Sequence, residues 1–197
     1  MLRAAGHTLP HMDTGEPLDA WAVTPDTQPI AANAYIGVWG ITAALREGAD
    51  IVVCGRVTDA SLTVGPCAWW HGWAVDDWQA LAGAVVAGHI IECGPHTTGG
   101  NFSGFTAVPL LQKPGFPIAE VAADGSAVIS KHSGQGGMVT VDTVTAQLVY
   151  EIQGPMYLNP DVSTDLSTVQ LQQPTPDRVL VRGARGFAPP ATTKLAL

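Results

Sequence analysis

The stretch "ANAYIGVWGITAALREGADIVVCG", residues 32–55, decides the predicted fold. Its first part predicts a helix that Asn33 caps and that ends just before Gly48. Apolar side chains on almost every side of this helix are typical of a buried helix. The uninterrupted apolar run 51–54 then lies between a helix end and a glycine, which is typical of a buried parallel strand. Together the two elements predict an α/β fold.

A second helix is predicted within "DDWQALAGAVVAGHIIECGP", residues 76–95. It would begin after Asp76 or Asp77 and end at Gly94 and Pro95. A strand over 89–93 explains fewer positions. The apolar stripe of this helix follows helical spacing and comprises Trp78, Leu81, Ala82, Val85, Val86, His89, Ile90 and Cys93.

Later segments predict shorter elements. Asp124-Gly125 suits a hairpin turn, a helix begins after Thr140 or Asp142, and "PTPD" at 174–177 joins two strands. The predicted fold class is therefore α/β, with a mainly parallel sheet flanked by helices that passes into a mixed or antiparallel C-terminal part. We expect residues 1–197 to form a single domain, with a possible sub-boundary near 104–115.

Composition excludes some classes of function. A net charge of −8 with only nine Lys and Arg residues argues against nucleic-acid binding. No stretch is long and apolar enough to predict a membrane span or a signal peptide. Three irregularly spaced cysteines predict no disulfide framework, which favours the cytoplasm. Charged residues make up 13% of the chain, against about 25% in typical domains. We therefore expect a partner to cover part of the surface, or the chain to be a piece of a larger protein.

The motif "GRVTDAS", residues 55–61, follows the predicted strand. Ligands of open α/β sheets bind beyond the carboxyl ends of strands, so Arg56, Thr58 and Asp59 are candidate site residues. Arg56 could hold a carboxylate or phosphate. Alternatively, Arg56 pairs with Asp59, and Asp59 or Ser61 caps the next helix. The sequence supports both interpretations equally.

The loop "TTGGN", residues 97–101, is a second candidate. Its glycines bring backbone amides close to a ligand, and its threonines and asparagine offer short polar side chains. A plain connecting loop is the equally weighted alternative. The motif "KHSGQGG", residues 131–137, could likewise present amides to an anion.

The stretch "HIIECGPH", residues 89–96, holds four side chains of the types that bind zinc, namely His89, Glu92, Cys93 and His96. However, Pro95 ends the helix before His96, and two of the four fall on the apolar stripe. The pattern favours a structural role, so we predict no metal site. Phosphate-binding and dinucleotide-binding motifs are also missing from the sequence, so we predict no cofactor.

Long blocks of the sequence resemble the acyclic terpene utilisation family AtuA. They run from "LRAAGHTLPHMDTGEPL" through "ANAYIGVWGITAALREGADIVVCGRVTDASLTVGP", "DWQALAGAVVAGHIIECG", "TGGNFS", "GFPIAEVAADGS" and "TVTAQLVYEIQGPMYLNPDV" to "DRVLVRGARG". Family members are longer, so the resemblance implies the central part of such a protein. It also implies a role in the catabolism of citronellol- or geraniol-derived acyl-CoA compounds, beside a biotin-dependent carboxylase. It assigns no catalytic residue.

Two functions follow as expectations. In the first, a lyase or hydratase acts on a carboxylated terpenoid acyl-CoA, with Asp59 as acid or base and Asn101 steadying an enolate oxygen. In the second, the chain is a non-catalytic accessory protein of an acyl-CoA carboxylase system. Either would form a homo-oligomer or join a partner subunit. The predicted substrate-binding residues are Arg56, Thr58, Thr97, Thr98, Gly99 and Gly100.

Overall fold

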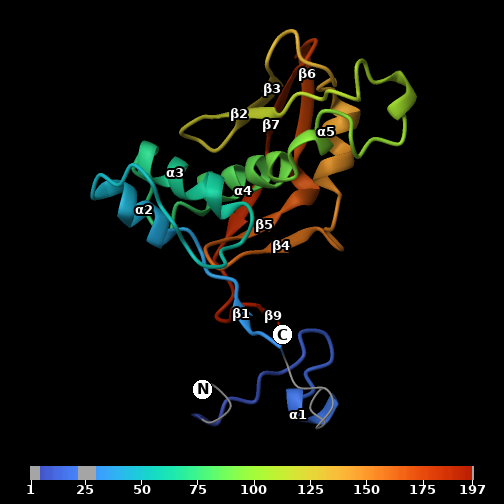
Figure 1. Ribbon diagram of the computed structural model, residues 1–197. Helices are drawn as coiled ribbons and strands as arrows, with labels where there is room; N and C mark the ends of the chain where they lie inside the picture. The colour runs from blue at the N-terminus through green and yellow to red at the C-terminus, as the bar shows by residue number, and fades with distance from the viewer. Residues whose placement is uncertain (1–4, 22–29, 197) are drawn as a thin grey trace. The chain divides into compact units, whose positions relative to one another are not determined.

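The computed structural model describes residues 5–21 and 30–196 (Figure 1). The chain forms two compact units. The first comprises Met1–Ala34 and Lys194–Leu197 and contains helix α1 (Leu18–Trp21) and the antiparallel pair β1 (Asn33–Ala34) and β9 (Leu195–Ala196). The second, Tyr35–Thr193, holds all the other helices and strands, and residues 104–115 lie within it.

The second unit contains two antiparallel sheets with helix α4 (Trp78–Glu92) between them (Figure 1). Helices α2 (Trp39–Arg46) and α3 (Ser61–His71) flank α4 on one side, and α5 (Val141–Leu148) on the other. Short 3₁₀ helices span Gly94–His96, Phe105–Ala107 and Leu166–Thr168. The four-stranded sheet has the order β2 (Pro117–Val121), β3 (Ala127–Lys131), β7 (Arg178–Arg182) and β6 (Gln170–Thr175), and the three-stranded sheet has the order β4 (Met156–Leu158), β5 (Ser163–Asp165) and β8 (Arg185–Phe187).

Helix α4 is the centre of the core. The predicted helix is confirmed: it begins after Asp77 and ends just before Gly94, whose φ of 53° turns the chain. Leu81 and Ile90 are fully buried, because α4 packs against α3, α5 and both sheets. At Gly83 the helix approaches the β2–β3 turn so closely that a Cβ would lie 2.2 Å from the carbonyl oxygen of Gly125.

The hairpins and the helix start predicted from short-range signals are also confirmed. Asp124-Gly125 lies in the turn that joins β2 to β3, and Pro176 and Asp177 of "PTPD" connect the end of β6 to β7. Helix α5 begins after Thr140, whose hydroxyl accepts a hydrogen bond from Thr143 N while the Thr143 hydroxyl accepts one from Thr140 N. This reciprocal capping satisfies amides that the first turn of a helix leaves unpaired.

The predicted mainly parallel sheet is wrong, because every sheet among the described residues is antiparallel. Residues 51–54 form no strand, and Ile51 and Val53 are 83% and 92% exposed. Parallel pairing in the described part of the chain is limited to two isolated bridges, Ile36 with Val57 and Pro114 with Gly136. The apolar run has the composition of a buried strand, but burial requires neighbouring strands that this run does not have here.

The helix predicted from Asn33 is also shorter than expected. Helix α2 begins at Trp39, and Asn33 lies instead in β1 of the other unit. Within α2 only Ile41 and Thr42 are buried, so the helix covers one side of the core and is not enclosed by it. The apolar pattern overstated its burial because Gly40 and Ala43 are small and are exposed in the structure.

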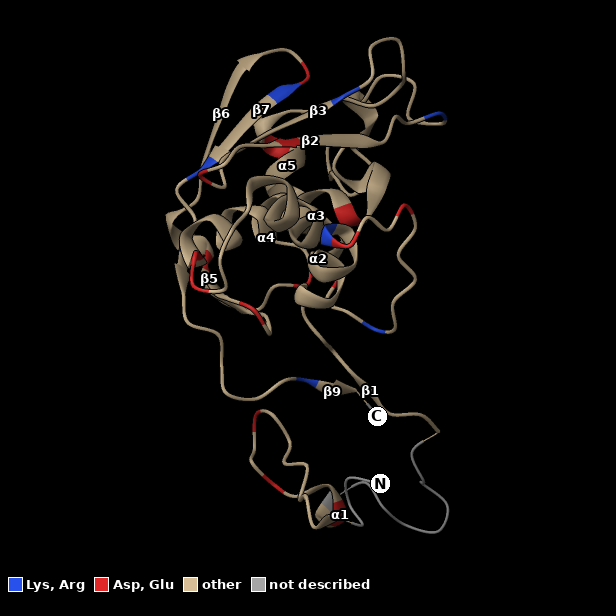
Figure 2. Ribbon diagram, turned by 90° about the vertical axis from the view of Figure 1, so that its left-hand side faces the viewer, with Lys and Arg blue, Asp and Glu red and all other residues tan. Residues whose placement is uncertain are grey.

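Charged residues are scarce on the helices that build the core (Figure 2). Helix α3 contains no Asp, Glu, Lys or Arg, and α4 contains only Glu92. No helix of the described segments has the length and hydropathy needed to span a bilayer. A single carboxylate on an otherwise uncharged core helix is an exception that needs an explanation.

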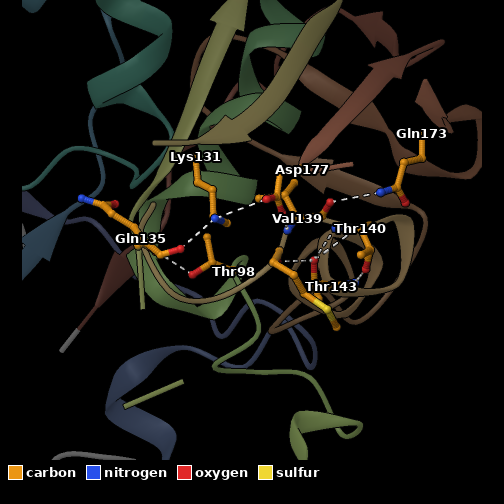
Figure 3. A network of polar contacts seen from close by, with 10 residues as sticks. Thr98, Lys131, Gln135, Val139, Thr140, Thr143, Gln173 and Asp177 are labelled. Atoms are coloured by element: carbon orange, nitrogen blue, oxygen red, sulfur yellow. Dashed lines mark hydrogen bonds and ion pairs between the residues drawn. The ribbon is translucent and has the colours of Figure 1, made fainter. Parts of the chain in front are cut away.

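The motif 131–137 is used to hold α5 in place (Figure 3). The Lys131 amine is 5% exposed, lies 3.3 Å from Asp177 Oδ2 and donates a hydrogen bond to Gln135 O at 2.9 Å. Asp177 Oδ1 in turn accepts a hydrogen bond from Val139 N at 2.8 Å. The network ties the β6–β7 turn to the segment that enters α5.

Candidate functional site

The candidate site is a pocket of about 450 Å³ between the start of α3 and the end of α4. Its volume suits a small organic ligand. One side is apolar, and three carboxylates face the same space. The lining residues are Asp59, Leu62, Thr63, Gly88, Ile91, Glu92, Cys93 and Glu151.

A close approach of two helices builds this pocket. Gly88 of α4 faces Ala60 at the start of α3, and a Cβ on Gly88 would lie 3.0 Å from Ala60 Cα. Because Gly88 has no side chain, the first turn of α3 lies directly against α4. That contact brings Asp59, the residue before Ala60, to the same pocket as Glu92, one helical turn beyond Gly88.

Asp59 and Arg56 form an ion pair at the edge of the pocket. Arg56 Nη1 lies 3.1 Å from Asp59 Oδ1, with the two side chains 47% and 51% exposed. The guanidinium also lies over the ring of Tyr35, 5.1 Å from its centroid. The pair predicted as the structural alternative is therefore present. Its exposure leaves Arg56 accessible to an anion, since exposed pairs are weak.

The predicted helix cap in this motif is not formed by Asp59 or Ser61. The residue before α3 is Ala60, and no side chain caps the helix there. The Ser61 hydroxyl lies 2.6 Å from the Thr58 hydroxyl instead. Substrate binding by Thr58 stays a prediction.

Glu92 and His89 form a buried pair one turn apart on α4. His89 Nδ1 lies 3.2 Å from Glu92 Oε1, and the two side chains are 3% and 12% exposed. The arrangement does not meet hydrogen-bond geometry, and Glu92 Oε2 and His89 Nε2 have no hydrogen-bond partner among the described residues. The ring of Tyr157 on β4 packs edge to face against the His89 ring, with 5.6 Å between the ring centroids. Unpaired buried polar atoms are costly, at about 1–3 kcal/mol each.

The carboxylates affect the pKa values of two neighbouring groups, Tyr157 and Cys93. Burial raises the pKa of the Tyr157 phenol to about 12, and the charges of Glu92, Asp59 and Glu151 contribute to the increase. Burial also raises the pKa of the Cys93 thiol, with Glu92 as the next cause, although a hydrogen bond with Gln147 lowers it. Both groups therefore stay protonated at neutral pH. The raised pKa makes Cys93 a poor nucleophile.

In the loop 97–101, which follows α4, residues 97–99 are buried, Asn101 is partly buried and Gly100 is exposed. Thr97 is fully buried and its hydroxyl donates to Ile90 O. The Thr98 hydroxyl lies 2.6 Å from Gly115 O, and the Asn101 amide donates to Ala146 O at 3.4 Å. These contacts agree with the connecting-loop interpretation.

The glycines of this loop have conformational roles. Gly99 has a φ of 119° and packs against Val108, and a Cβ on Gly100 would lie 2.9 Å from Pro95 O. None of residues 97–101 lines the pocket beside Asp59. Substrate binding by Thr97, Thr98, Gly99 and Gly100, and catalysis by Asn101, stay predictions.

Sequence reasoning missed Glu151 and Tyr157. Glu151 follows α5 in a loop with a φ of 62°, and no local pattern connects it with α4. Tyr157 lies in a three-residue strand. The usable signal was the spacing of His89 and Glu92, which places both on one helix face.

Within the described ranges, no group of three or more His, Cys, Asp or Glu side chains is arranged to hold a metal ion.

Two other hollows border the start of α4. The larger, of about 600 Å³, is lined by Gln79, residues 167–170 and residues 183–185, and Arg185 is its single charged lining residue. The smaller, of about 260 Å³, is lined partly by Asp124 and Arg182. Neither brings more than one carboxylate together, whereas three line the pocket beside Asp59, which makes that pocket the stronger candidate.

Comparison with known proteins gives one family. A family model described as "Acyclic terpene utilisation family protein AtuA" matches residues 2–197. Searches of curated proteins and of solved structures gave no match.

Proposed function

The chain belongs to the acyclic terpene utilisation family AtuA, and we propose that it acts on a terpenoid acyl-CoA ester as a lyase or hydratase. The observation that carries the proposal is the pocket that Asp59 and Glu92 line together. Hydration of an enoyl thioester needs one group to take a proton from water and another to deliver a proton. Two carboxylates in different surroundings suit those roles.

The two carboxyl groups differ strongly in exposure. The Asp59 side chain is 51% exposed and that of Glu92 is 12% exposed. In the hydration direction one carboxylate accepts a proton from water, whose oxygen bonds to the β-carbon of the enoyl thioester. The other group, in its protonated form, delivers a proton to the α-carbon. The lyase direction reverses these steps.

The rest of the pocket fits the substrate class. Leu62 and Ile91 provide an apolar wall for a branched hydrocarbon chain. Arg56, held over Tyr35, is available to bind the carboxylate of a carboxylated terpenoid. The proposal does not depend on residues 97–101.

The test compares Glu92→Gln, Asp59→Asn and Arg56→Ala with the unchanged protein, using a geraniol-derived enoyl-CoA ester and the loss of its enoyl thioester absorbance. We expect the two carboxamide variants to lower kcat by on the order of 10²-fold and Arg56→Ala to raise KM. Glu47→Gln, which alters an exposed carboxylate after α2, is the matched control. Full turnover by Glu92→Gln would show that the reaction does not use this pocket.

A non-catalytic accessory role is the second candidate, favoured by the exposed apolar side chains. Ile51, Val53 and Trp70 are 83%, 92% and 74% exposed, which suits a surface that a partner covers. The proposed partner is an acyl-CoA carboxylase or a second copy of the chain. Sedimentation velocity with and without the carboxylase tests this role. A protein that sediments as an isolated monomer in both runs does not have it.

A further inference from the structure

We infer that His89 is a positioning residue, which orients the Glu92 carboxyl in the pocket through its contact with Oε1. The inference rests on the proposed function and explains how the buried carboxyl of Glu92 is oriented. The contact of 3.2 Å between His89 Nδ1 and Glu92 Oε1 involves one oxygen of the carboxyl. Oε2 is buried without a hydrogen-bond partner among the described residues, on a side chain that lines the pocket.

The imidazole has a fixed place. Its side chain is 3% exposed, and the ring of Tyr157 packs on it from β4. From α5, the side-chain amide of Gln147 donates to the backbone oxygen of His89 at 3.3 Å. Contacts from two other elements thus fix both the backbone and the ring of His89. A ring fixed in this way can hold a carboxyl in one orientation.

Packing alone does not account for a histidine at this position. His89 occupies a stripe of α4 whose other buried members, among them Val85, Val86 and Ile90, are apolar. A leucine would fill a stripe position without burying two ring nitrogens that lack partners. A polar pair such as His89 and Glu92 lowers stability when it is buried, and such pairs are expected at functional sites.

The charged and titratable groups around the pair are mostly acidic, with Arg56 beside Asp59 as the cation. Glu92 comes from α4 itself and Tyr157 from β4, while Asp59 and Glu151 both act on Tyr157. Among these groups Glu92 is the one whose carboxyl lies close to the His89 ring, at 3.2 Å from Nδ1. The pair therefore couples specifically through the Glu92 carboxyl.

The kinetic test compares His89→Leu, His89→Gln and Glu92→Gln with a geraniol-derived enoyl-CoA ester. We expect His89→Leu to lower kcat by on the order of 10²-fold with KM unchanged, because the carboxyl loses its orientation. His89→Gln, which keeps a donor, should recover part of that loss. Unfolding curves confirm that each variant folds. If His89→Leu keeps the original kcat while Glu92→Gln is inactive, the positioning role is wrong and the proposed function stands.

A second measurement needs no substrate. The ring ¹⁵N resonances of His89 in the otherwise unchanged protein should shift in Glu92→Gln and stay in place in Glu47→Gln. Shifted resonances support the contact between His89 and Glu92. If Glu92→Gln nevertheless retains turnover, the proposed function is wrong but the contact stands. Unshifted resonances would overturn the inference even if the kinetic results agreed with it. This measurement also replaces the kinetic test if His89→Leu does not fold.

Discussion

Val38 N donates a hydrogen bond of 3.0 Å to Asp161 Oδ2, and so joins two segments 123 residues apart in the sequence. Asp161 is 7% exposed. The neighbouring residue is Gly37, where a Cβ would lie 2.1 Å from Asp161 Oδ1. The start of α2 is thus tied to the connection between β4 and β5, which closes the unit around α4.

Replacing Asp161 should change how stability depends on pH. Burial raises the pKa of Asp161, and the hydrogen bond from Val38 only partly opposes that shift. The stabilising contribution of a carboxyl with a raised folded pKa is fully present below its unfolded value and is lost as pH rises through the folded pKa. Asp161→Asn keeps an acceptor oxygen and should remove this decline, as urea unfolding between about pH 3 and about pH 7 can measure.

Asp165 provides a control of opposite sign. Hydrogen bonds from Ser167 lower the pKa of Asp165, so its contribution is present above the unfolded value and is lost as pH falls. Asp165→Asn should therefore flatten the acid side of the stability profile. Identical profiles for the two variants would contradict the assignment for Asp161.

Adding a methyl group at Gly88 should destabilise the unit and change the shape of the pocket. The new Cβ would lie 3.0 Å from Ala60, so α3 must move away from α4 at a cost of about 1–3 kcal/mol. Gly40→Ala is the matched control, because nothing lies within 4 Å of the position in α2. It should stabilise by roughly 0.5–1 kcal/mol through helix propensity. Equal unfolding midpoints for both variants would mean that the helices do not approach each other as described.

Thr97→Val should lower stability and leave substrate affinity unchanged. The valine keeps the shape of threonine but leaves Ile90 O, inside the structure, without its hydroxyl partner. The expected loss is about 1–3 kcal/mol in the free energy of unfolding. Thr97→Ser keeps the hydroxyl and should lose less. A raised KM at unchanged stability would restore the binding role predicted for this loop.

Val53→Thr should have almost no effect on stability, within about 0.5 kcal/mol, because Val53 is 92% exposed. The same substitution at Val179, which is fully buried on β7, places a hydroxyl in the core and should cost about 1–3 kcal/mol. Thermal unfolding of both variants measures the contrast. A large loss at Val53 would mean that residues 51–54 are buried in solution.

The parts of the fold that the sequence predicted are those set by short-range chemistry. The turn at Asp124-Gly125, the cap at Thr140 and the apolar period of α4 each depend on residues close together in the chain. The run 51–54 failed because a parallel strand needs partners from elsewhere. Its composition shows that it can be buried, but not what would bury it.

The sequence also predicted only those parts of the site whose residues lie close together in the chain. Arg56 and Asp59 were found because they share one short motif. The pairing of Glu92 with His89 was visible as helical spacing, although zinc-type ligands were the first comparison. Glu151 and Tyr157 reach the site only through the packing of α5 and β4, and no sequence pattern encodes that contact.

Because α4 contacts α3, α5 and strands of both sheets, none of these elements can separate from the others while α4 keeps its packing. The amide protons of the buried stretch Leu81–Ile90 should therefore exchange with solvent only when the whole unit opens. The ion pair of Arg56 and Asp59, whose side chains are about half exposed, can break and re-form without that opening. The unit thus combines an interior that should exchange slowly with an ion pair at the surface that can rearrange.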